Sequence, residues 1–210
     1  MKGLMLKDFY QLIKNCKMFF LFDVAFLAIS FFSEGNSMFI GFPVMFSGIL
    51  PLTLLSFDER EGWSYYCGTL PFSEKQIVSA KFLFGLIAQF VTAVVVAAVV
   101  FVRSIVFPEY GFTENLMVVG VMFVASLIFP AFCLPFCYKF GTEKGRVAYL
   151  IVVGLTTAVC MPMYGTIVDL FENNEAGNLK ILFPLILIGI TVVYIISWLI
   201  SIPLLKSNKK

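Results

Sequence analysis

The chain has 210 residues, of which 60% are hydrophobic and only 13% are charged, and its formal net charge is +2. A soluble domain carries about 25% charged residues. Together with a mean hydropathy of +0.95, this composition excludes both a disordered chain and an ordinary water-facing surface. The length allows one compact unit, so we expect a single all-α integral membrane domain over residues 1–210.

Several kinds of catalytic and metal site are excluded. The chain contains no His, which removes Ser-His-Asp and Cys-His nucleophiles and the usual zinc sites. Cys133 and Cys137 lie four positions apart, but two thiols are too few for a metal, so we expect packing residues and no bound metal. The phosphate-binding pattern G-x-x-x-x-G-K-[ST] does not occur. We therefore expect a non-catalytic chain that binds no cofactor itself.

The opening segment, 1–17, has helical periodicity. One face is apolar, with Met5, Phe9, Leu12, Ile13 and Cys16, and the other is polar, with Lys7, Asp8, Gln11, Lys14 and Asn15. This pattern predicts a helix in the membrane interface, whose Lys side chains reach the lipid phosphates. Because the segment lacks a continuous apolar core, we do not expect a cleavable signal peptide.

Six apolar stretches then follow one another along the chain. Their approximate limits are Met18 to Phe32, Met38 to Phe57, Phe82 to Val102, Leu116 to Tyr138, Val147 to Val168, and Ile181 to Leu204. All but the first have about 20 residues or more, enough to cross a hydrocarbon core of ~30 Å. The first is long enough only if its helix begins near Asn15. The pattern predicts six transmembrane helices.

The charges between these stretches indicate an orientation. The two termini, the loop after the second stretch and the loop after the fourth together hold 13 of the 15 basic residues, and only Arg103 and Lys180 lie on the other side. Since cytoplasmic loops carry an excess of Lys and Arg, we expect a multi-pass protein of the cell membrane with both termini in the cytoplasm.

The segment that joins the second and third stretches carries more than a simple loop needs. Trp63, Tyr66, Cys67 and Leu70 recur at helical spacing, which predicts a short amphipathic helix. Pro71 ends it, and Ser73 with Gln76 forms a capping box that starts the next helix. A run of charges, Asp58–Glu61, precedes the helix. An aromatic face beside a mixed-charge face suits docking to a partner.

This segment carries a family resemblance. The pattern D-E-R-E-G-W-x-x-Y-x-x-x-L-P-x-S-x-K-x-I-V-x-x-K, together with the opening K-G-L-M-L-K-D-F-Y, resembles the small membrane subunits of type-2 ABC exporters, of the kind found in bacterial antimicrobial- and cytolytic-peptide exporters. In that family this segment, 58–72, holds the coupling helix that contacts the ATPase. The resemblance and the charge run imply an ATPase contact made by Asp58, Glu59, Arg60, Glu61, Gly62, Trp63, Tyr66, Leu70, Pro71 and Lys75. Glu61 and Glu74 depart from the family pattern and change the local charge.

The resemblance also implies an assembly. The chain would form the translocation path as a homodimer, or as a pseudo-dimer with a related permease, and a separate ABC-type ATP-binding subunit would bind ATP and Mg. Gly154 and Ala158, spaced for close helix approach, lie on the fifth stretch, which forms the subunit interface with the first in that family. The apolar lining suits an amphipathic peptide or a lipid-like substrate. We expect contact with membrane lipid and none with nucleic acid.

Two questions stay open at this level. Asp23 is the one carboxylate within an apolar stretch; it marks either a functional site or a residue near the interface, hydrated or paired with Lys17. The main alternative function is the substrate-binding membrane subunit of an energy-coupling vitamin importer, which would need a polar pocket near the outer surface. An intramembrane enzyme and a channel or membrane anchor are less compatible with the absence of His and with the docking-like segment.

Overall fold

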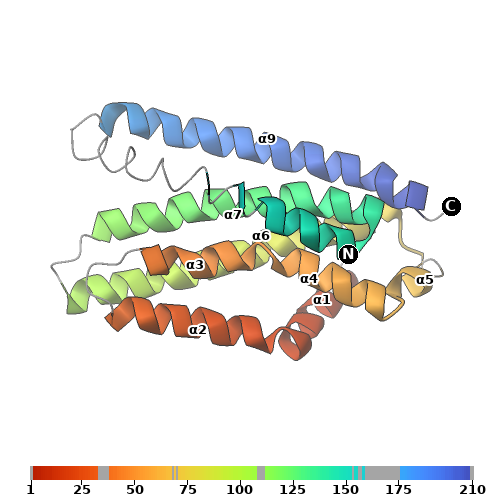
Figure 1. Ribbon diagram of the computed structural model, residues 1–210, viewed down its shortest axis with the longest axis horizontal. Coiled ribbons are helices and arrows are strands. Elements are labelled where there is room, and N and C mark those ends of the chain that lie inside the picture. Colours follow the sequence, from red (N-terminus) through yellow and green to blue (C-terminus); the bar gives the residue numbers. More distant parts are fainter. Residues whose placement is uncertain are drawn as a thin grey trace. The chain divides into compact units, whose positions relative to one another are not determined.

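The computed structural model describes residues 2–32, 38–67, 69, 71–107, 112–152, 154–155, 158 and 176–208. Within these ranges there is no strand. The helices are α1 (Lys2–Asn15), α2 (Lys17–Phe32), α3 (Met38–Ser47), α4 (Leu50–Arg60), α5 (Trp63–Cys67), α6 (Glu74–Val106), α7 (Phe112–Phe140) and α9 (Ala176–Asn208) (Figure 1). Residues 142–152 are helical as well. The chain divides into two compact units, Met1–Pro130 and Ala131–Lys210.

Four of the described helical segments are long and apolar enough to cross a membrane: Phe39–Arg60, Glu74–Val106, Val118–Phe140 and Leu187–Lys206. They overlap the second, third, fourth and sixth predicted stretches. The first stretch is α2, whose 16 residues make a helix about 24 Å long, shorter than the hydrocarbon core. The fifth lies largely outside the described residues. For the described residues, an all-helical fold with helices apolar enough to cross a membrane is confirmed, and the number six stays a prediction.

The second predicted stretch is broken into α3 and α4 at Gly48 and Ile49. Pro51, near the start of α4, has no N–H, and its ring obstructs the carbonyl four residues earlier. That carbonyl belongs to Ser47, the last residue of α3. A Cβ added to Gly48 would lie 2.9 Å from the Ser126 carbonyl oxygen, so the break also lets this backbone approach α7 closely.

Apolar side chains hold the first unit together in two clusters. One joins α3, α6 and α7 through Ile40, Val44, Val96, Val100 and Val119. The other joins α1, α4 and α6 through Leu12, Cys16, Leu50, Leu54 and Phe84. α2 lies beside α3 (Figure 1), where the Phe26 ring stacks on Phe42 and Phe46 with centroids 5.4 Å and 5.7 Å away. The cluster that contains Leu12 holds α1 against α4 and α6.

The predicted capping box at the start of α6 is confirmed. The Ser73 hydroxyl accepts a hydrogen bond from the Gln76 N–H, and the Gln76 side chain accepts one from the Ser73 N–H. α6 has 33 residues and is therefore about 50 Å long. This length exceeds the ~30 Å hydrocarbon core. The first two turns of α6, which carry Lys75 and Lys81, precede the apolar run that begins at Phe82.

The second unit packs through small and polar side chains. The Ser197 hydroxyl donates a hydrogen bond to the Ala131 carbonyl, and the Ser201 hydroxyl donates one to the Ser197 carbonyl over 2.8 Å. Both serines are buried, so this stripe of α9 lies against the last part of α7. Gly141, at φ +86°, ends α7.

Candidate functional site

Four charged side chains meet where α1, α4 and α6 come together, and we call them the four-charge cluster: Lys7, Asp8, Asp58 and Lys81. Lys81 Nζ lies 2.7 Å from both Asp8 Oδ1 and Asp58 Oδ2. Lys7 Nζ lies 2.5 Å from Asp58 Oδ1 and 3.3 Å from Asp8 Oδ1. Each carboxylate therefore meets two ammonium groups, and the formal charges of the cluster cancel.

Three of the four charged side chains in this cluster are buried, so their pairing matters for stability. Asp8, Asp58 and Lys81 are only 1%, 3% and 4% exposed. Charges out of water are costly unless they are paired and hydrogen-bonded, and removing one partner leaves the others uncompensated. The ion pairs of the cluster therefore hold α1 against the end of α4 and the start of α6. Separating any two of these helices would leave a charged side chain without its partner.

The turn after α4 brings the start of α5 to the same place. Gly62 has φ +68°, a left-handed conformation that favours glycine, and its N–H donates to the Glu59 carbonyl over 3.2 Å. α5 begins immediately afterwards. The Lys7 ammonium lies 4.2 Å from the centre of the Trp63 ring, within reach of a cation–π interaction. Lys7 thus connects Asp58 and Trp63.

α5 has an inner and an outer side. Cys67 is buried and anchors its end, while Tyr66 is 60% exposed and its ring lies 5.6 Å from that of Trp63. Further exposed residues lie before and after it in the chain: Glu59, Arg60, Glu61, Thr69, Pro71 and Lys75. An aromatic and charged surface therefore lies next to the four-charge cluster.

The structure separates the residues assigned to the ATPase contact into groups. Glu59, Arg60, Glu61, Tyr66, Pro71 and Lys75 are exposed, and Trp63 is partly buried against Lys7. Asp58 instead lies inside the chain, paired with Lys7 and Lys81, and Gly62 makes the turn. Leu70 lies outside the described residues.

Sequence reasoning missed the partners of Asp58. Lys7 was expected to reach lipid phosphates, and it pairs with Asp58 instead. Asp8 was placed on a polar face but is buried. Lys81 was counted only as a cytoplasmic charge. Lys81 lies one residue before a long apolar run, and this position could have indicated an ion pair. A Lys that is buried at the start of a packed helix needs a counter-charge.

The first helix is also rotated from the expected orientation. α1 buries Leu4, Asp8, Gln11 and Leu12, and it exposes Leu6, Phe9, Tyr10 and Ile13. Asp8 and Gln11 of the polar face thus lie against the protein, and Phe9 and Ile13 of the apolar face point outward, as an interfacial helix would present them to lipid. Cys16, at the junction with α2, is 1% exposed, and burial raises the pKa of its thiol.

Asp23 lies on the side of α2 that faces the neighbouring helices, in line with Phe19 and Leu27, which pack against the two apolar clusters. Its Oδ1 is buried and has no hydrogen-bond partner among the described residues. Lys17 is exposed, and the ion pairs found in the described part of the chain do not include one between these two residues.

The residues assigned to a subunit interface, Gly154 and Ala158, are both exposed. A Cβ added to Gly154 would meet no described atom within 4 Å. Val147, Leu150, Ile151 and Leu155 are exposed beside them. This helix therefore presents an apolar face with small residues, which is compatible with either lipid or a second subunit.

Comparison with known proteins decides the family. The family model described as ABC-2 family transporter protein matches residues 3–206, nearly the whole chain. The chain belongs to the ABC-2 transporter family. It is therefore a membrane component of an ABC transporter, a class that works with an ABC ATP-binding partner. The family match does not support the alternative as a vitamin-importer subunit. Neither a curated protein nor a solved structure matches the chain significantly.

Proposed function

We propose that this ABC-2 chain is the permease subunit of an ATP-driven exporter, in which α5 is the coupling helix that receives the ATP-binding subunit. The observation that carries the proposal is the arrangement around Lys7, which contacts both Asp58 at the end of α4 and the Trp63 ring of α5. A force applied to α5 would pass directly into α4, and through Asp58 and Lys81 into α6.

The mechanism is a rigid-body movement. The ATP-binding subunits hold ATP and Mg, and their closure displaces α5. Since Asp58, Lys81 and Asp8 are buried and mutually paired, α1, α4 and α6 follow together instead of separating. α4 is the second part of the segment Phe39–Arg60, and α6 is the segment Glu74–Val106. Both segments are apolar enough to span the membrane, so the movement reaches the translocation path.

The contact itself uses the exposed side of the coupling segment. Trp63 and Tyr66 form its aromatic centre, and Glu59, Pro71 and Lys75 are exposed around them. Aromatic residues near an interface centre commonly dominate binding energy, whereas rim charges contribute less. Arg60 and Glu61 are exposed as well, but they line a separate groove against α1.

The assembly and its cargo extend the same proposal. Two copies, or one copy and a related permease, form the path with the first and fifth spans at their interface. Both termini lie in the bacterial cytoplasm, in line with the distribution of basic residues. The abundance of apolar side chains, 60% of the chain, favours an amphipathic peptide or a lipid-like molecule as the exported substrate.

Site-specific photocrosslinking tests the docking surface. A benzophenone amino acid replaces Tyr66 in one variant, and Phe107, at the opposite end of α6, in the control variant. Both side chains are exposed. We expect a crosslink to the ATP-binding subunit from position 66 and none from position 107. Equal crosslinking at the two positions, or none at position 66, would refute the docking role of α5.

A further inference from the structure

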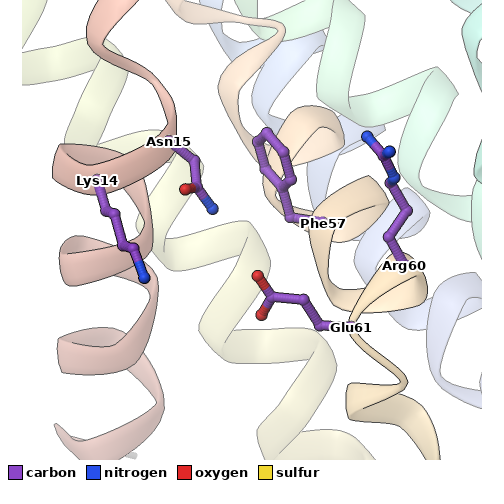
Figure 2. Close-up of a pocket in the computed structure, with 5 residues that line it drawn as sticks. All are labelled: Lys14, Asn15, Phe57, Arg60 and Glu61. Atoms are coloured by element: carbon purple, nitrogen blue, oxygen red, sulfur yellow. The ribbon is translucent and has the colours of Figure 1, made fainter.

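A groove of about 500 Å³ lies between the end of α1 and the end of α4, lined by Lys14, Asn15, Phe57, Arg60 and Glu61. Figure 2 shows the Asn15 carboxamide and the Glu61 carboxylate pointing into the space between the two helices, with the Phe57 ring on the α4 side of that space. Lys14 and Arg60 lie on its opposite flanks. The groove therefore combines a central acceptor pair, two flanking cations and one apolar wall.

The groove lies where two apolar segments end, which is the inner boundary of the membrane in the proposed topology. α1 ends at Asn15, and α2 begins two residues later at Lys17 with a run of apolar side chains. α4 ends there too, after the apolar segment Phe39–Arg60. On the lipid side, the exposed apolar residues Tyr10 and Ile13 of α1 and Met18 of α2 lie close to Lys14 in sequence, so the flank of the groove is continuous with an apolar surface.

We propose that this groove binds the headgroup of phosphatidylethanolamine from the inner leaflet. The primary ammonium of that headgroup donates hydrogen bonds to the Glu61 carboxylate and the Asn15 amide oxygen. Its phosphate accepts from Lys14 or Arg60, and the glycerol end of the acyl chains lies along Phe57. A volume of about 500 Å³ falls within the range of ~300–1,000 Å³ that small-molecule sites occupy.

Charge favours this occupant over other lipids. The lining residues carry two cations and one anion, so an anionic headgroup without an amine would leave the Glu61 carboxylate next to a phosphate. Phosphatidylcholine has the same charges as phosphatidylethanolamine, but its quaternary ammonium has no N–H to donate. The site should thus distinguish the two zwitterionic lipids through Glu61 and Asn15.

Native mass spectrometry of lipids retained by the purified chain tests the proposal. The protein is reconstituted in nanodiscs with equal amounts of phosphatidylethanolamine and phosphatidylcholine and then released. Wild type should retain more phosphatidylethanolamine. In Glu61→Gln that preference should fall about threefold, the effect of losing one exposed ion pair. Lys14→Gln should reduce retention of both lipids while leaving their ratio unchanged, because it removes a phosphate contact.

The controls are Glu143→Gln and Lys144→Gln, two exposed residues that do not line the groove, and both should behave as wild type. Soluble glycerophosphoethanolamine at millimolar concentration should not displace the lipid if the acyl chains contribute to binding. A wild-type ratio in Glu61→Gln would overturn the proposal. If Glu61→Gln also lowers co-purification with the ATP-binding subunit while its lipid ratio stays at the wild-type value, Glu61 is a protein contact and the proposal is wrong.

Discussion

Lys81 stands one residue before the apolar run that begins at Phe82, and it is 4% exposed. Its ammonium balances both Asp8 and Asp58 at 2.7 Å. In Lys81→Met two buried carboxylates would share only Lys7, so we expect a loss of about 3–5 kcal/mol of stability. Lys75→Met, on the exposed turn before it, should cost at most about 0.5 kcal/mol. Thermal unfolding of the purified protein measures both.

A second variant separates charge balance from packing. Combining Lys81→Met with Asp8→Asn leaves one cation, Lys7, and one anion, Asp58, which remain paired at 2.5 Å. The double variant should therefore be more stable than Lys81→Met alone. A double-mutant cycle of these variants should show a coupling free energy between Lys81 and Asp8 above about 1 kcal/mol. Strictly additive effects would mean that Lys81 and Asp8 do not stabilise each other.

Single residues also mark the limit of what the sequence could predict at the site. The capping box of Ser73 and Gln76 was predicted because both partners lie within one turn of each other. Asp58 was assigned to the partner surface because it opens a charged loop. Its true partners, Lys7 and Lys81, lie far from it in sequence, and no local pattern shows which of two surfaces a loop carboxylate faces.

At the scale of helices, periodicity identified α1 as amphipathic but not its orientation. Lipid and protein interior are both apolar, so an apolar stripe does not indicate which of the two it faces. The choice depends on Asp8 and Gln11, which turn the polar edge of the helix inward. Similarly, the break between α3 and α4 was not predicted, although Pro51 disfavours a continuous helix there, and at this break Gly48 packs closely against α6 and α7.

Helix packing between α4 and α6 provides a further prediction. A Cβ added to Gly85 would lie 2.5 Å from Pro51 Cγ, and a proline ring cannot rotate away. Gly85→Ala should therefore lower stability by about 1–3 kcal/mol through overpacking. Gly189→Ala in α9, where a Cβ would meet no described atom within 4 Å, is the matched control. If both variants melt at the wild-type temperature, α4 and α6 do not approach as closely as described.

For the whole molecule, composition and span lengths were enough to predict an all-helical membrane protein, and the family match is consistent with that class. They were not enough to count the spans. α2 has 16 residues, and a helix of that length can either cross a thinned bilayer or lie partly in the interface. Subunit association is also beyond the sequence, because small-residue spacing occurs on lipid-facing helices too.

Dimerisation through the fifth span gives a prediction at this scale. Gly154 lies on an exposed apolar face, and close approach of two backbones there would be blocked by a larger side chain. Gly154→Leu should shift the permease from dimer to monomer on native mass analysis, while Gly189→Leu, at another open glycine, should not. A dimer that persists in Gly154→Leu would place the interface elsewhere.

The central claim is that α5 transmits the free energy of ATP hydrolysis into the membrane helices, and Trp63→Ala tests it most directly. Two quantities are measured for each molecule of purified permease: the amount of ATP-binding subunit that it retains and the rate of ATP hydrolysis. Trp198→Ala in α9 is the control. Truncating a central interface aromatic costs about 2 kcal/mol, so we expect retention to fall about 30-fold, with the permease yield and the control unchanged. Reduced yield with wild-type retention and hydrolysis per molecule would contradict the claim and leave Trp63 as a membrane anchor.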